Sequence, residues 1–285
     1  MERRANTWVE GHGGVTLSMS DVGPLNAPEI ILIHGWSQCS ESFKRQERSF
    51  LTEKYRLIMP NLRGHGFSQA PDEAEAYSTS ATWAADIAAV IEQLELHKPL
   101  LIGWSMGGWI VNDYIRAYGD DALAGSGLVG SSLTTGRYLS EAARKSRLDD
   151  PDVAALGMYE EDKNVQHAAV EAFLRACFAT QPEPEDFNHM VWFNMMCKPH
   201  VRRACRMRNE DYRETAARMR RPCLVNWGAQ ERLVTRPMVE EAVATIPRAT
   251  FYEYDDAGHA PFWEKPERFN ADLDAFATQA FEEAA

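Results

Sequence analysis

The sequence lacks long hydrophobic runs and an excess of basic residues, and each absence excludes a class of protein. No apolar stretch among the 285 residues approaches the roughly 18–20 residues that a membrane-spanning helix needs. The first residues, MERRANTWVEG, have no apolar segment behind their arginines, so we expect no secretory signal. With 30 Lys and Arg against 42 Asp and Glu, the net charge of −12 argues against nucleic acid and anionic membranes as partners.

Cysteines are also few, odd in number and never spaced as C-x-x-C. Five such residues favour reduced thiols in a cytoplasmic protein over a disulfide framework or a zinc site. No group of ligating side chains has the spacing of a metal site, and residues 11–14 (GHGG) lack the Lys-Ser/Thr of a phosphate-binding loop. We therefore expect no metal and no cofactor. The sequence carries no signal of oligomeric state.

Short apolar runs alternate with longer amphipathic segments over most of the chain. Runs that are apolar on both faces, such as EIILI and PLLIGW, are typical of strands covered by helices on both sides. The alternation indicates an α/β fold with a mostly parallel, doubly wound sheet. The predicted strands are Glu29–Ile33, Tyr55–Met59, Pro99–Trp104, Gly125–Val129, Cys223–Trp227 and Thr250–Tyr254.

Between these strands the sequence predicts helices at Ser80–Leu96, Met106–Tyr118 and Arg236–Ile246. The first of them repeats apolar residues at a helical spacing, which gives it one buried face. Pro237 falls in the first turn of the last one, where its missing N–H is harmless. Residues 7–10 and 15–20 flank GHGG and predict an N-terminal hairpin.

Strand signals stop between Leu133 and Arg221, over a stretch that is too long for an ordinary loop. The stretch is helical in character, so we predict a helical cap (residues 133–221) inserted into a core made of residues 1–132 and 222–285. Aromatic and Met side chains are dense at 187–197 (FNHMVWFNMMC), where they could pack the cap or line an apolar substrate pocket. The basic run at 202–208 (RRACRMR) reads as a solvated face of the cap. The candidate substrate contacts are Trp104, Trp192, Phe193 and Met196.

The strongest chemical signal is the G-x-S-x-G match at residues 103–107, where an apolar strand runs directly into a helix. Such a turn exposes the Ser105 hydroxyl at the carboxyl edge of the sheet, and small flanking residues let the backbone pass. The backbone N–H groups of Met106 and of Trp36, in the HGW that follows a strand, are candidates for an oxyanion hole. His34 of the same HGW reads as a structural residue that holds its loop by a hydrogen bond.

A histidine and an acid complete the predicted catalytic group. His259 follows the last predicted strand and is the predicted general base for the serine. Glu231 follows the strand CLVNW and is the predicted acid that orients the imidazole. Asp255 and Asp256 are its rivals, since they precede the histidine closely.

Together, and in this order, these pieces resemble the α/β-hydrolase superfamily over nearly the whole chain. Residues 61–68 (NLRGHGFS) look like the family's D-x-R-G-x-G-x-S stretch, and residues 258–267 look like its histidine loop. The likeness is greatest to the esterase, lactonase and cofactor-free haloperoxidase (perhydrolase) group. It implies an α/β-hydrolase fold with a helical cap and a small-molecule substrate. The implied reaction is cleavage, through an acyl-enzyme, of a carboxylic ester or lactone of a small-to-medium apolar or aromatic substrate.

The sequence departs from the family pattern at two positions, and two alternative functions stay open. Glu231 and Asn61 stand where family members usually have Asp. Cofactor-independent dioxygenases that cleave quinolone rings show a similar P-N-x-R-G-H-G run, but their histidine is held by an Asp that would fall near Gly130 and is missing here. A non-enzymatic small-molecule receptor of this fold is the other alternative. Ser105 excludes the branches with an Asp nucleophile, namely haloalkane dehalogenases and epoxide hydrolases.

Overall fold

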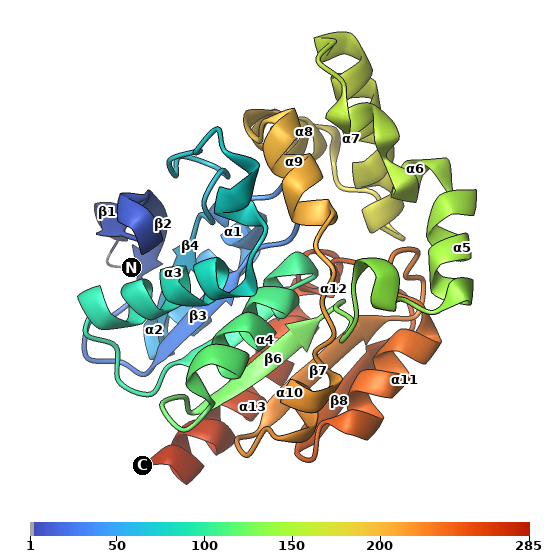
Figure 1. Cartoon of the computed structure of the whole chain (residues 1–285). Helices are drawn as coiled ribbons and strands as arrows, with labels where there is room; N and C mark the ends of the chain where they lie inside the picture. Colours follow the sequence, from blue (N-terminus) through green and yellow to red (C-terminus); the bar gives the residue numbers. More distant parts are fainter. Residues whose placement is uncertain (1–2) are drawn as a thin grey trace.

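A single eight-stranded sheet organises the computed structural model, which describes residues 3–285 (Figure 1). The strand order is β1-β2-β4-β3-β5-β6-β7-β8. The hairpin β1–β2 is antiparallel and pairs antiparallel with β4, whereas β4, β3 and β5 to β8 run parallel, as predicted. The strands are β1 Arg3–Glu10, β2 Thr16–Val22, β3 Glu29–Ile33, β4 Arg56–Pro60, β5 Leu100–Trp104, β6 Gly125–Val129, β7 Cys223–Gly228 and β8 Ala249–Tyr254.

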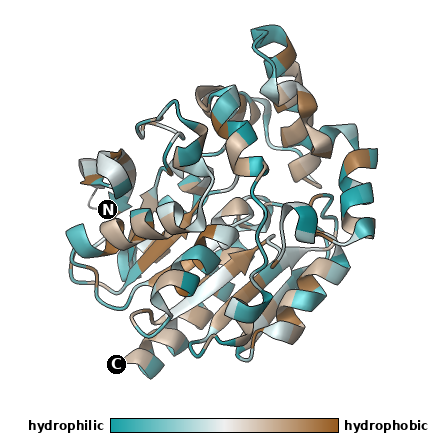
Figure 2. Ribbon diagram, viewed as in Figure 1, coloured by the Kyte–Doolittle hydropathy of each residue, from teal (hydrophilic) through white to brown (hydrophobic). Residues whose placement is uncertain are grey.

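Burial explains why the strands could be predicted. Every residue of β3 to β7 is buried, which accounts for the mostly apolar sequences on both faces of these strands. The edge strand β8 is half-exposed and carries a mixed sequence. Figure 2 shows the hydrophobic residues concentrated in the strands and the hydrophilic ones along the outer surfaces of the helices.

Helices cover both faces of the sheet (Figure 1). Helices α3, α4, α10 and α11 contact one another in sequence order along one face, and α1, α12 and α13 contact one another on the other face. No helix within residues 3–285 combines the length and the apolar composition needed to cross a membrane. The bounds are α1 Lys44–Glu47, α2 Leu51–Lys54, α3 Ser80–Gln93, α4 Met106–Tyr118, α10 Arg213–Ala217, α11 Arg236–Thr245, α12 Pro261–Glu264 and α13 Pro266–Ala284.

Between β6 and β7 the chain forms helices and one isolated bridge, from Thr134 to Asp211. The helices α6 to α9 gather beyond one end of the sheet, above the strands (Figure 1). Helix α10 instead contacts α4 and α11, so the end of residues 133–221 lies against the side of the sheet. The bounds are α5 Glu141–Asp149, α6 Pro151–Ala154, α7 Lys163–Cys177, α8 Pro184–Met196 and α9 Pro199–Arg206.

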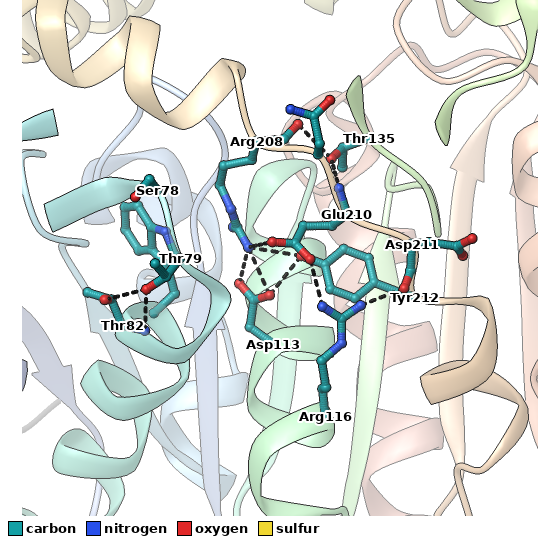
Figure 3. Close-up of polar contacts among 12 residues, drawn as sticks. Ser78, Thr79, Thr82, Asp113, Arg116, Thr135, Arg208, Glu210, Asp211 and Tyr212 are labelled. Atoms are coloured by element: carbon teal, nitrogen blue, oxygen red, sulfur yellow. Dashed lines mark hydrogen bonds and ion pairs between the residues drawn. The ribbon is translucent and has the colours of Figure 1, made fainter. Parts of the chain in front are cut away.

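A buried ion pair ties the end of this helical region to α4 (Figure 3). Nη2 of Arg208 lies 2.7 Å from Oδ2 of Asp113, and the Tyr212 hydroxyl donates to Oδ1 of the same carboxylate at 2.7 Å. Arg116 stacks over the Tyr212 ring, 4.5 Å from its centroid, and pairs with Glu210 at 2.6 Å. The guanidinium of Arg208 is therefore a structural anchor. The prediction that residues 202–208 form a solvated face is wrong at this position.

Two neutral histidines are buried where β3 and β4 end. His34 Nε2 accepts from the Leu62 N–H at 3.0 Å, and His34 Nδ1–H donates to the Gly35 carbonyl oxygen at 2.8 Å. Its ring centroid lies 5.1 Å from that of His65, whose Nδ1 contacts the Arg63 carbonyl oxygen at 2.9 Å. His34 therefore holds its loop, as the sequence predicted.

These histidines should make stability fall in mild acid. Burial lowers the pKa of His65 from 6.5 to about 4 and that of His34 well below its ordinary value. As the pH falls, the unfolded chain binds protons at these histidines before the folded chain does. Their contribution to the free energy of unfolding is therefore complete above pH 6.5 and is lost as the pH falls towards 4. For His65 the loss is on the order of 3 kcal/mol. Urea unfolding of His65→Gln should show a shallower pH dependence over this interval; parallel curves for variant and wild type would contradict it.

Candidate active site

Ser105 sits on a strained turn between β5 and α4. Its φ of 54° is rare for a residue with a side chain, and such strain is typical of functional turns. A Cβ at Gly103 would lie 2.2 Å from the Gly107 carbonyl oxygen, and one at Gly107 would lie 2.3 Å from that of Ile33. Both positions must therefore be glycine. The Ser105 N–H donates to the Val129 carbonyl oxygen at 2.8 Å, which fixes the turn against β6.

The two candidate oxyanion donors belong to segments next to this serine. Met106 is the first residue of α4, so its N–H has no partner within the helix. The loop that carries Trp36 packs closely against the serine, since a Cβ at Gly35 would lie only 3.2 Å from Ser105 Cβ. Within residues 3–285 neither the Trp36 N–H nor the Met106 N–H donates a backbone hydrogen bond. Both N–H groups therefore stay candidates for the oxyanion hole.

His259 and Glu231 form a buried pair. His259 Nδ1 lies 2.5 Å from Glu231 Oε2, and the two side chains are 2% and 0% exposed. The other oxygen of Glu231 accepts from the Leu233 N–H at 2.7 Å, and this fixes the carboxylate. The pairing leaves Nε2 of His259 as the imidazole nitrogen that can exchange a proton with a substrate or nucleophile.

The histidine lies next to the serine turn. The rings of His259 and Trp104, the residue before Ser105, have centroids 5.5 Å apart, and Trp104 Nε1–H donates to the His259 carbonyl oxygen at 2.8 Å. No hydrogen bond joins the Ser105 hydroxyl to His259 in this structure. In enzymes without substrate that contact is often long and tightens in the complex.

The rival acids do not reach the histidine. Asp255 and Asp256 are exposed, and Asp256 pairs with Lys265 at 2.6 Å. The end of β6 does reach it, since a Cβ at Gly130 would lie 3.1 Å from His259 Nδ1 and 3.3 Å from Glu231 Oε2. A side chain on Gly130, which has a φ of +51°, would be strained and would crowd the pair. The carboxylate that meets His259 is therefore that of Glu231, in the loop that follows β7.

Asn61 departs from the family pattern for a structural reason. Its Oδ1 accepts from the Ser40 N–H at 2.7 Å, and its Nδ2 donates to the Ser18 hydroxyl at 2.8 Å. An aspartate could accept but could not donate when ionised. The side chain joins the loop after β3 to β2 and takes no part in the candidate site.

A family model described as alpha/beta hydrolase fold matches residues 28–266. The chain belongs to the α/β-hydrolase family. The AB hydrolase superfamily protein YisY of Bacillus subtilis is 27% identical over 271 residues, which cover 92% of this chain and 96% of that protein. A putative aryl esterase from Burkholderia cenocepacia has 32% identity and a TM-score of 0.88 over 97% of this chain and 99% of that one. Esterase RhEst1 from Rhodococcus sp. ECU1013 has 29% identity and a TM-score of 0.84 over 98% and 99%.

In this α/β hydrolase a cavity of about 40 Å³ opens at Ser105, which is room for roughly three water molecules. Its walls are mostly apolar, and sequence reasoning missed all of the lining except Ser105 and Trp36. No periodicity distinguishes a residue that faces a cavity from one that faces the core. The remaining lining residues are Trp109, Gly130, Ser131, Ser132, Arg147, Val153, Phe173, Arg206, Leu233 and Val234.

The four side chains predicted as substrate contacts do not line this cavity. Trp192 is 51% exposed on the outside of α8, where it stacks on His189. Phe193 is buried with its ring edge against His189, and Trp104 packs between His259 and Phe262. Met196 is half-buried near the end of α8. The aromatic density at 187–197 therefore reflects packing within the helical region, the other interpretation that the sequence allowed.

The prediction that residues 202–208 form a solvated face is also wrong at Arg202. Its side chain is fully buried and donates to the Ser37 hydroxyl at 3.0 Å and to the carbonyl oxygen of Asn194 at 2.5 Å. In return, Trp36 Nε1–H donates to the Arg202 carbonyl oxygen at 2.9 Å. Since Trp36 supplies a candidate oxyanion donor, α9 positions part of the site from above.

Proposed function

We propose that this hydrolase cleaves a carboxylic ester or lactone through an acyl-enzyme on Ser105. The buried contact between His259 and Glu231, at the end of the sheet that carries the serine turn, is the observation on which the proposal depends. A putative aryl esterase and an esterase among the similar structures support the same reaction class. The free, buried state of all five cysteines supports a reducing, cytoplasmic location.

The proposed mechanism assigns one task to each group. The Ser105 oxygen attacks the carbonyl carbon while His259 takes the hydroxyl proton and then returns it to the leaving alcohol. Glu231 holds the imidazole in the required tautomer and stabilises its charged form. The N–H groups of Trp36 and Met106 bind the oxyanion, and each such donor lowers the barrier by roughly 3–4 kcal/mol. Water, activated by the same histidine, then cleaves the acyl-enzyme.

The walls of the cavity favour a small apolar or aromatic group next to the reacting carbonyl. Trp36, Trp109 and Phe173 present aromatic surface there, and Leu233 and Val234 present aliphatic surface. We therefore propose a short-chain substrate. p-Nitrophenyl esters of rising chain length measure this directly, and the specificity constant should fall as the acyl chain outgrows the cavity.

A fluorophosphonate probe tests the proposed nucleophile. The probe should label the folded protein once, and peptide mapping should place the adduct on Ser105, because only an activated serine displaces the leaving group quickly. The variant His259→Ala should label far more slowly.

Absence of labelling in folded protein would contradict the proposal and favour a receptor. Oxygen uptake with a quinolone-type substrate, retained in Ser105→Ala and lost in His259→Ala, would instead support the ring-cleaving dioxygenase.

A further inference from the structure

Two guanidinium groups line the cavity that contains Ser105. Arg147 comes from α5 and Arg206 from the last turn of α9, and both are partly buried. The guanidinium of Arg206 lies over the Trp36 ring, 4.8 Å from its centroid. The wall beside the candidate nucleophile thus carries two positive charges in a protein whose net charge is −12.

Neither guanidinium forms an ion pair with a carboxylate within the part of the chain that the structure describes. Arg147 Nε–H donates to the Leu233 carbonyl oxygen at 3.2 Å, and Arg206 Nη2–H donates to that of Val153 at 2.8 Å. A guanidinium has five N–H donors, so most donors of each side chain are still available. Neutral carbonyl oxygens hold the two side chains in place without neutralising them.

The neighbouring carboxylates are engaged elsewhere. Asp150 and Asp152 both pair with Arg232, at 2.7 and 3.2 Å. Glu231 pairs with His259 at 2.5 Å. Burial, and in second place the charge of Arg206, lower the pKa of Arg147 to about 10 although the charge of Glu231 acts to raise it, and burial also lowers the pKa of Arg206. Each guanidinium is therefore short of solvation and repelled by the other. A bound anion would relieve both effects.

We propose that Arg147 and Arg206 form an anion subsite, which takes a carboxylate carried by the substrate a few bonds from the reacting carbonyl. Guanidinium groups bind carboxylates in paired, directional hydrogen bonds. The apolar lining from Val153 and Phe173 suits a short aliphatic spacer between the two groups. The substrate class is then a monoester of a short dicarboxylic acid. The ester bond in this inference rests on the proposed function, whereas the subsite rests on the two arginines alone.

The test compares a charged and a neutral ligand of the same chain length. Monomethyl succinate and dimethyl succinate are used as competitors of p-nitrophenyl acetate hydrolysis by the full-length enzyme. The monoester anion should compete at least tenfold more strongly, since a charge-assisted hydrogen bond contributes about 1.5–3 kcal/mol. The preference should shrink in high salt. Arg147→Met and Arg206→Met should each bring the two inhibition constants close to parity.

Exposed arginines on the same two helices supply the controls. Arg144→Met on α5 and Arg203→Met on α9 should keep the wild-type preference. The ratio is measured within one sample, so a variant that folds poorly does not distort it. Equal inhibition by the two succinates in the wild type, or an unchanged ratio in both cavity variants, would overturn the subsite while leaving ester hydrolysis in place. No hydrolysis of p-nitrophenyl acetate and no probe adduct would overturn the proposed function instead, and calorimetry with monomethyl succinate would still test the subsite.

Discussion

Replacing Ser105 with alanine is expected to lower kcat/KM for an ester by about 10³–10⁶-fold. The loss follows because the hydroxyl on the turn between β5 and α4 is the only atom proposed to form the acyl-enzyme. Water held by the oxyanion donors of Trp36 and Met106 would account for the remaining rate. Initial rates with p-nitrophenyl acetate measure the effect, and active-site titration confirms that the burst of product disappears.

Ser131 provides the matched control. Its hydroxyl lines the same cavity but donates to the Ser105 carbonyl oxygen at 2.8 Å, so it supports the turn and is not poised to attack. Ser131→Ala should lose less than about tenfold in kcat/KM, which corresponds to the net contribution of one hydrogen bond. A loss in Ser131→Ala as large as that in Ser105→Ala would move the nucleophile, and full activity in Ser105→Ala would end the acyl-enzyme mechanism.

Glu231→Gln is expected to lower kcat by about 10²–10⁴-fold with a much smaller change in KM. The carboxylate accepts from His259 Nδ1 and also from the Leu233 N–H, so an amide in its place satisfies one contact and misaligns the other. The imidazole then loses both its preferred tautomer and the negative charge that stabilises its protonated form. Steady-state kinetics over a range of pH separate this loss from a change in substrate binding.

Three further variants show whether the position of the carboxylate matters. Glu231→Asp keeps the charge but withdraws it by one methylene, so it should recover part of the activity that Glu231→Gln loses. Asp255→Asn and Asp256→Asn should stay within about twofold of the wild type, because both side chains are exposed. Near-native turnover of Glu231→Gln, combined with a large loss in one aspartate variant, would reassign the acid.

Local signals account for what could be predicted. Each predicted strand of the parallel sheet matches an observed one to within a residue. All of them except the edge strand β8 are buried on both faces, which favours the short, mostly apolar runs that the sequence shows. The turn at Ser105 could also be predicted from the sequence. Steric crowding by the Gly107 and Ile33 carbonyl oxygens allows only glycine at positions 103 and 107, and this produces the recognisable motif. The structural role of His34 followed from its place at the end of a strand.

The helical region shows where such signals fail. Residues 202–208 are strongly basic and read as a solvated face, yet the side chains of Arg202 and Arg208 are fully buried. Trp192 was a candidate substrate contact, but its side chain is exposed on the surface. Arg147 lies in a polar helix, EAARKSRLD, whose composition gives no sign of a cavity. In each case the environment comes from segments far away in the sequence.

The amino-acid sequence by itself determined where the parallel strands lie along the chain, the turn that carries Ser105 and the residue types available for chemistry at one edge of the sheet. These features depend on interactions between residues close together in the chain. Only the tertiary structure decided that Glu231 meets His259 in place of Asp255 or Asp256, and that Arg147 and Arg206 face the cavity. Burial and charge pairing depend on which distant carbonyl and carboxylate groups the fold brings within hydrogen-bonding distance, and composition does not encode that distance.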